Sequence, residues 1–214
     1  MRKMTNEEKE RFSEMLACLF SPPDREMVEQ VHQGNIHAFF QHYFQIWGKD
    51  KDILKGFLIE GGPEIIFRDL EEEYGNLFSS EAGRGKISLA ESFYKPWTQD
   101  LHCPLSFATE KGLLMGDSAL HLLALYKQCG LELGGKYRGM PDHLVMELEF
   151  LSFLYRWATD KEIKRFIGDH LDWITLLREE FREFHPHPFY RSAMEVLILF
   201  LRQEKERLEV ECNG

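Results

Sequence analysis

A helical stripe in the stretch from Gly139 to Tyr155 constrains the fold more than any other part of the chain. Apolar residues recur there at intervals of four, three and four, which is the spacing of one buried helical face: Leu144, Leu148, Leu151 and Tyr155. Pro141 predicts the start of this helix, because proline suits the first helical position. Asp142 would then lie in the first turn, where the helix dipole favours a negative charge.

The same periodicity extends through most of the chain. Thr5 predicts a capping box with Glu8, and proline or glycine separates most of the apolar periodic segments. We expect about eight to eleven helices, in the segments 5–20, 24–32, 36–47, 63–78, 116–129, 141–154, 160–167, 171–181 and 189–209. No strand-like alternation appears, so the sequence predicts an all-α, single-domain helical bundle over residues 1–214, with a weak joint near 130–139.

Three local features carry further expectations. The segment Gly168–His170 is expected to break the helix that begins at Asp160, and the polar segment Glu204–Arg207 is expected to fray into solvent. Ile65 is expected to face inward with the apolar residues of 63–78. Residues 79–96 form the longest stretch without clear periodicity, and loops of this length in compact domains are often functional.

Charge and cysteine usage exclude several classes of function. The formal net charge of −10 disfavours nucleic acid and anionic lipid as partners and favours basic ones. The four cysteines are scattered without a CxxC pair, which is typical of reduced thiols in a cytoplasmic protein. The N-terminus lacks the apolar core of a secretory signal, and no apolar run reaches the ~20 residues of a membrane helix. We therefore expect a cytoplasmic protein without stable membrane insertion.

Motifs for catalysis or cofactor binding are not found in the sequence. There is no Walker-type phosphate loop, no HExxH zinc motif and no GxSxG nucleophile elbow. His185 and His187 could share a metal ion, but no third ligand lies at helical spacing from them. We expect no cofactor and no catalytic residues.

Two short segments have both a functional and a purely structural interpretation. Asp142 and His143 could form a polar anchor in a binding groove, or they could simply complete the start of a helix. The residues Tyr94 and Trp97 could line a groove for a peptide, or they could fill the core beneath a long loop. Spacing alone favours the structural interpretation for Asp142 and His143.

An ordered set of segments resembles the TorD/DmsD/NarJ group of cytoplasmic chaperones for molybdenum-containing redox enzymes. The segments that carry the resemblance are Glu73–Phe78, Ala90–Tyr94, Tyr126–Leu131, Met140–Leu144, Glu147–Phe150, His170–Trp173 and Phe189–Tyr190. The group favours proline where this chain has Ala90, and often Gly-Pro where it has Ser79-Ser80. The first 60 residues match in helical character only.

The resemblance implies an all-helical fold of the TorD-like type and a binding function without catalysis. The partners it implies are the precursor of a molybdopterin oxidoreductase and its twin-arginine signal peptide, held until the cofactor is inserted. Some members bind GTP or form domain-swapped dimers, so the chain could be a monomer or a swapped dimer. The peptide-binding residues that we predict are Glu91, Ser92, Tyr94, Trp97, Pro141, Asp142, His143 and Glu147.

Two other functions are compatible with the same residues. One is an all-α metal- or nucleotide-dependent enzyme, because His143 and Glu147 lie four residues apart on a helix and could share a ligand. The other is an adaptor that holds an intact oxidoreductase without recognising its signal peptide.

Overall fold

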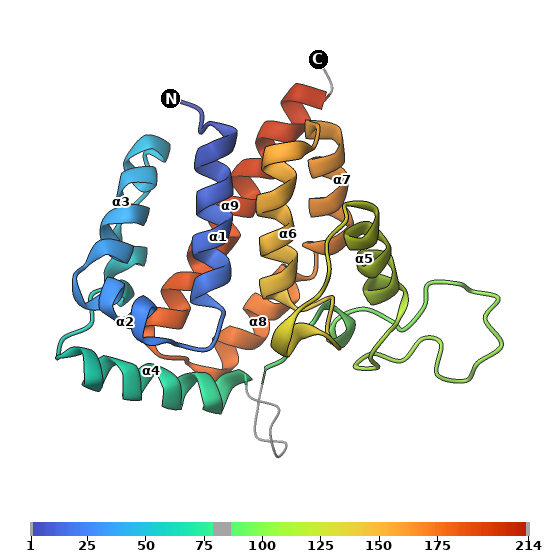
Figure 1. Ribbon diagram of the computed structural model, residues 1–214, viewed down its shortest axis with the longest axis horizontal. Coiled ribbons are helices and arrows are strands. Elements are labelled where there is room, and N and C mark those ends of the chain that lie inside the picture. Colours follow the sequence, from blue (N-terminus) through green and yellow to red (C-terminus); the bar gives the residue numbers. More distant parts are fainter. Residues whose placement is uncertain (1, 79–86, 213–214) are drawn as a thin grey trace.

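The computed structural model describes residues 2–78 and 87–212, which Figure 1 shows as an assembly of helices. The α-helices are α1 (Asn6–Leu19), α2 (Arg25–His32), α3 (Asn35–Trp47), α4 (Pro63–Phe78), α5 (Asp117–Gln128), α6 (Leu144–Trp157), α7 (Asp160–His170), α8 (Ile174–Phe184) and α9 (Pro188–Cys212). The short 3₁₀ helices are η1 (Asp52–Phe57), η3 (Glu91–Phe93) and η4 (Gly135–Tyr137). These two ranges contain no strand, only an isolated bridge, so the predicted all-α class is confirmed.

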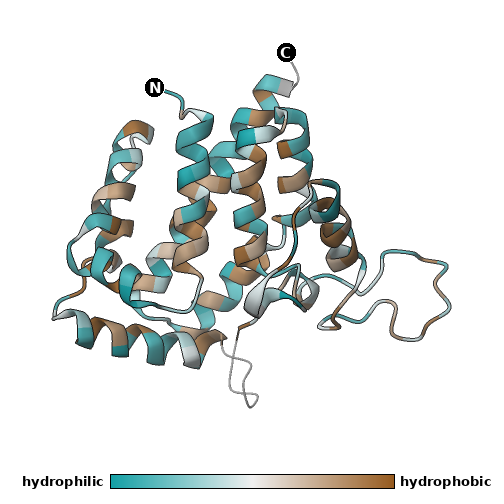
Figure 2. Ribbon diagram, in the orientation of Figure 1, coloured by the Kyte–Doolittle hydropathy of each residue, from teal (hydrophilic) through white to brown (hydrophobic). Residues whose placement is uncertain are grey.

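Helices α1, α6, α7 and α9 form the central group, and α4 crosses beneath one end of it (Figure 1). The ring of Phe12 lies at the centre of an aromatic cluster, 4.6 Å from Phe200 and 5.1 Å from Phe40 between ring centroids. Apolar residues of the helices turn toward this interior, whereas hydrophilic residues occupy the outer faces (Figure 2). Burial of these aromatic faces joins the N-terminal and C-terminal helices into one core.

Most helix starts follow from local sequence. Thr5 caps α1 through a capping box with Glu8, Asp24 caps α2, and α4 begins at Pro63 as predicted. The prediction for Ile65 is wrong, because this side chain is 47% exposed while Ile66 is fully buried.

Helix α6 begins at Leu144, so the predicted start at Pro141 is wrong. His143 is the N-cap, and its Nδ1 accepts a hydrogen bond from the backbone N–H of Val145 at 3.2 Å. The backbone at His143 stays extended because it pairs with Ala90 in an antiparallel bridge. Asp142 therefore precedes the helix and does not lie in its first turn. The predicted buried stripe is confirmed: Leu144, Leu148, Leu151 and Tyr155 are at most 1% exposed.

Two other predicted boundaries are also wrong. Helix α7 continues through Gly168 to His170, because the capping box at Thr159 and the burial of His170 outweigh the ~1 kcal/mol that a helical glycine costs. Helix α9 does not fray after Glu204. This carboxylate accepts a hydrogen bond from the hydroxyl of Tyr155 at 3.0 Å and pairs with Arg207.

The segment between η3 and α5 extends away from the helices, at the right of Figure 1. It includes Leu101, which is 93% exposed. Of the predicted functional loop 79–96, residues 79–86 lie outside the described residues, and the rest contains η3. Among the described helices, none combines the length and apolar content that a bilayer crossing requires.

Candidate peptide-binding site

Two motif-bearing segments that are far apart in the sequence lie against each other in the structure. The backbone N–H of Leu144 donates to the carbonyl of Leu89 at 2.7 Å, and the N–H of Glu91 donates to the carbonyl of Asp142 at 2.9 Å. The fold thus places the residues around Glu91 beside the start of α6. This contact brings six of the eight predicted site residues into one region: Glu91, Ser92, Tyr94, Pro141, Asp142 and His143.

Asp142 occupies a buried position at this contact. Asp142 is only 1% exposed, and its Oδ2 accepts a hydrogen bond from the backbone N–H of Ser92 at 2.9 Å. Ser92 is itself 5% exposed. A buried carboxylate that accepts a backbone N–H stabilises the contact between the two segments. The structure therefore gives Asp142 a role in holding the site together.

Glu91 lies at the centre of a buried ionic network. Its Oε1 is 2.6 Å from the Nζ of Lys95, which also pairs with Asp172 at 2.6 Å. Its Oε2 lies 3.0 Å from the Nδ1 of His170, whose Nε2 lies 2.8 Å from the Nδ1 of His121. Burial lowers the pKa of Lys95, but hydrogen bonds to Asp172 and Glu91 outweigh this and leave it raised. Lys95 therefore stays charged and compensates the buried carboxylate.

Glu147 lies beneath this region and is fully buried. Its Oε2 accepts a hydrogen bond from the Nε1 of Trp173 at 3.1 Å. Burial raises the pKa of Glu147 well above its ordinary value of 4.5, and the charges of Glu91 and Asp142 raise it further. This raised pKa favours the protonated, neutral form of Glu147, which relieves the repulsion of three buried carboxyl groups. The residue belongs to the interior beneath the site.

A largely apolar cavity of about 590 Å³ opens beside these segments. Its walls combine apolar side chains with four polar ones, and the residues that line it are Phe78, Ile87, Ser88, Leu89, Ala90, Phe93, Tyr94, Gly112, Leu114, Met140, His143 and Glu180. A concave apolar surface with a few polar groups is the usual form of a ligand site. This cavity is the candidate binding site.

Of the eight predicted site residues, His143 and Tyr94 line this cavity. The ring of Tyr94 stacks on Trp173, with 5.0 Å between ring centroids. Trp97 does not line it and contacts Phe107 in the projecting segment, with 5.1 Å between ring centroids. Pro141 is buried, and its carbonyl accepts a hydrogen bond from the hydroxyl of Tyr126 at 2.9 Å.

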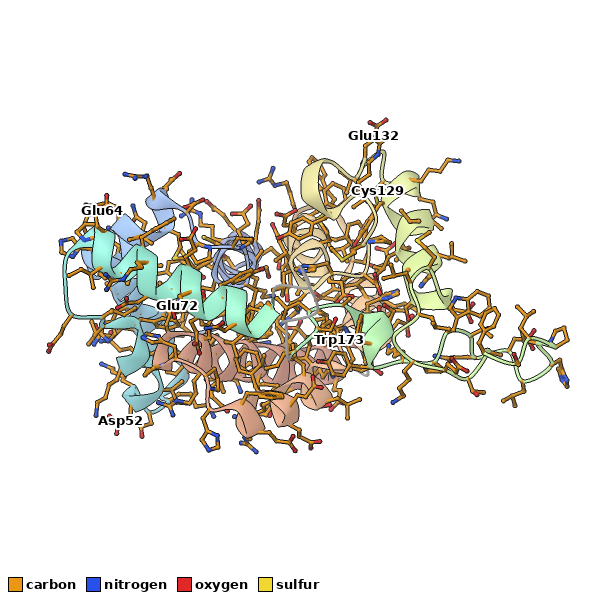
Figure 3. The ribbon with its side chains drawn as sticks, turned by 90° about the horizontal axis from the view of Figure 1, so that it is seen from below. Asp52, Glu64, Glu72, Cys129, Glu132 and Trp173 are labelled. Carbon is orange, nitrogen blue, oxygen red and sulfur yellow. The ribbon has the colours of Figure 1, made fainter. Side chains whose placement is uncertain are left out.

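Sequence reasoning missed four residues of this region: Lys95, His170, Trp173 and Glu180. Figure 3 shows Trp173 in the interior, whereas Asp52 and Glu132 lie at the edge of the molecule. His170 and Trp173 stood in a segment that carries the family resemblance, and this was the only signal for them. Lys95 follows Glu91 by four residues, a spacing that could have indicated their ion pair. No spacing rule connects Glu180 to the site, because its partner Tyr94 lies far away along the chain.

The alternative of a metal enzyme gains no support from the side chains that the structure describes. Among them, no group of three or more histidine, cysteine, aspartate or glutamate side chains is arranged to hold a metal ion. The Nδ1 of His143 is engaged by the N–H of Val145, and Glu147 faces Trp173.

Comparisons with known proteins agree with the fold and the resemblance. A family model described as nitrate reductase delta subunit matches residues 53–193. The chain is 28% identical over 116 residues to a Vibrio cholerae protein named chaperone protein TorD, a match that covers 49% of this chain and 53% of that protein. The chain thus aligns with about half the length of this relative. A crystal structure from Archaeoglobus fulgidus, described as a redox enzyme maturation protein, has the same fold, with a TM-score of 0.55 and 20% identity over 98% of this chain and 96% of that one.

Proposed function

The chain belongs to the nitrate reductase delta subunit family, and on this basis we propose that it is a chaperone for the maturation of a redox enzyme. The two relatives described above are named as a chaperone and as a redox enzyme maturation protein, which supports binding of a client in place of catalysis. In this proposal the chaperone acts in the cytoplasm. It binds the twin-arginine signal peptide or the apoprotein of a molybdopterin oxidoreductase and holds back export until the cofactor is inserted.

The observation that carries this proposal is the apolar cavity formed by the segments that bear the family resemblance. Leu89, Ala90, Phe93 and His143 belong to those segments or adjoin them, and all four line the cavity. A signal peptide has a basic front and an apolar stretch behind it. The cavity can bury apolar side chains of such a stretch, and the net charge of −10 accelerates the approach of its basic front.

Phe93→Ala tests the proposal with little risk to the fold, because Phe93 is 50% exposed and lines the cavity. The probe is a synthetic peptide of two arginines followed by a run of leucine and alanine, and calorimetry measures its affinity. Loss of a large aromatic contact is expected to weaken binding roughly tenfold. Leu101→Ala is the matched control, since Leu101 is more exposed and lies outside the cavity. Absence of binding to the unaltered protein, or equal effects of both substitutions, would contradict the proposal.

A further inference from the structure

Among the described residues that line the cavity, one side chain is acidic. This side chain is Glu180, which belongs to α8. The described lining contains no lysine or arginine. A partly exposed carboxylate at an apolar cavity favours a cationic group on the ligand. The lining can therefore select ligands by charge, which apolar walls alone cannot do.

Asp142 does not supply this charge. It is 1% exposed, its Oδ2 is engaged by the N–H of Ser92, and it is not among the residues that line the cavity. A ligand cation could reach it only if the contact between η3 and the start of α6 opened. The sequence analysis predicts Asp142 as a peptide-binding residue, but in the structure the carboxylate that lines the cavity is that of Glu180.

The neighbouring cations of α8 leave Glu180 without a described ion-pair partner. Arg178 donates from its Nε to the Oε1 of Glu195 at 2.9 Å, and Arg182 lies 3.9 Å from the same oxygen. Both arginines thus pair with α9. Within residues 2–78 and 87–212, no lysine or arginine forms a salt bridge with Glu180.

Tyr94 holds the Glu180 carboxylate in place. Its hydroxyl donates a hydrogen bond to Oε2 of Glu180, and its ring is fixed by stacking on Trp173. Burial raises the pKa of Tyr94, and the hydrogen bond and charge of Glu180 raise it further, so the phenol remains a donor. An anchored carboxylate loses little rotamer freedom on binding, which suits the paired donors of a guanidinium group.

We propose that Glu180 is the residue of this cavity that recognises an arginine side chain, in a ligand whose neighbouring apolar residues occupy the cavity. This inference rests on the proposed function, since it names the charge-recognising residue of the same site. The ligand class is an apolar peptide segment that carries an arginine at one end. Tyr94 is a positioning residue that acts through Glu180.

The test combines one protein substitution with one peptide substitution. The first peptide has two arginines followed by leucine and alanine, and the second has citrulline in place of both arginines. Citrulline keeps the shape of the side chain and removes its charge. The unaltered protein is expected to bind the arginine peptide roughly tenfold more tightly than the citrulline peptide. In Glu180→Gln this preference is expected to disappear, while affinity for the citrulline peptide stays unchanged.

Glu179→Gln is the matched control, because Glu179 adjoins Glu180 on α8 and is exposed outside the cavity. It is expected to keep the tenfold preference. The inference is overturned if Glu180→Gln keeps that preference, if it weakens both peptides equally, or if the unaltered protein does not distinguish them. If the unaltered protein bound neither peptide, this result would contradict the proposed function as well as the inference about Glu180.

Discussion

At the scale of one residue, Glu147 illustrates how burial changes the role of an ionisable side chain. The sequence allows Glu147 to be a groove contact or a metal ligand, because it lies four residues after His143. The structure buries it completely against Trp173, close enough to Glu91 and Asp142 for their charges to raise its pKa. Its carboxyl group accepts a hydrogen bond from the indole N–H of Trp173, and burial favours the neutral form of this group.

The substitution Glu147→Gln tests this protonation state. The folded-state pKa is raised, so this group's contribution to stability is complete below its ordinary pKa of 4.5 and is lost as pH rises through the folded-state value. Glutamine cannot titrate. The free energy of unfolding of the variant relative to the unaltered protein should therefore rise with pH, by up to about 1.4 kcal/mol per unit within that window.

Urea unfolding at several pH values above 4.5 measures this trend. Glu72→Gln, on the exposed face of α4 (Figure 3), removes the same charge without burial and is expected to show no such trend. A constant difference between Glu147→Gln and the unaltered protein at every pH would mean that Glu147 is ionised in the folded state.

At the scale of one element, the end of α9 shows how tertiary contacts extend a polar helix. Arg207 pairs with Asp160 at 2.9 Å and with Glu204 at 2.9 Å, and Lys9 lies 3.8 Å from Glu204. Leu208 is fully buried one position further along. These contacts tie the last turns of α9 to α1 and α7, so the polar composition of this segment does not cause fraying.

Leu208→Ala is expected to lower the free energy of unfolding by about 2–4 kcal/mol, since it removes a fully buried side chain and leaves a cavity. Val210→Ala provides the control, because Val210 is 72% exposed in the same helix and should change stability by less than about 0.5 kcal/mol. Chemical denaturation measures both. Equal, small effects would show that this part of α9 is not packed in solution.

At the scale of the whole molecule, η1 packs against the start of α9, although the two elements are far apart in the sequence. Gly56 makes this close approach possible: a Cβ atom there would lie 2.1 Å from the carbonyl oxygen of Pro188 and 2.4 Å from the hydroxyl of Ser192. That hydroxyl donates to the carbonyl of Ile53 at 2.6 Å. The N-terminal and C-terminal parts thus meet through backbone contacts that leave no room for a side chain.

Gly56→Ala is therefore expected to destabilise the protein by about 2–3 kcal/mol, because two backbone segments must move apart. Gly62→Ala serves as the control, since a Cβ there meets no atom within 4 Å and would lose nothing or gain up to about 1 kcal/mol. Thermal unfolding compares the two variants. If Gly56→Ala were as stable as Gly62→Ala, η1 could not lie this close to α9.

The sequence by itself determined the all-α class, most helix positions and the buried stripe of α6, because helical periodicity and capping are local properties of neighbouring residues. It also identified the segments that meet at the site, through the ordered resemblance around Glu91 and Asp142. Its boundary errors were at the start of α6, within α7 and at the end of α9. There, the bridge of Ala90 with His143, the burial of His170 and the ion pairs of Arg207 outweigh local preference.

Only the tertiary structure decided what each polar residue of the site does. In the sequence, the carboxylates of the site cannot be told apart. In the structure, Glu91, Asp142 and Glu147 are buried, whereas Glu180 from α8 lines the cavity. Solvent exposure depends on which elements cover a side chain, and those elements lie far away along the chain. Spacing therefore predicts the face of a helix on which a carboxylate lies, while the packing of distant elements decides whether it faces a ligand, a partner side chain or the core.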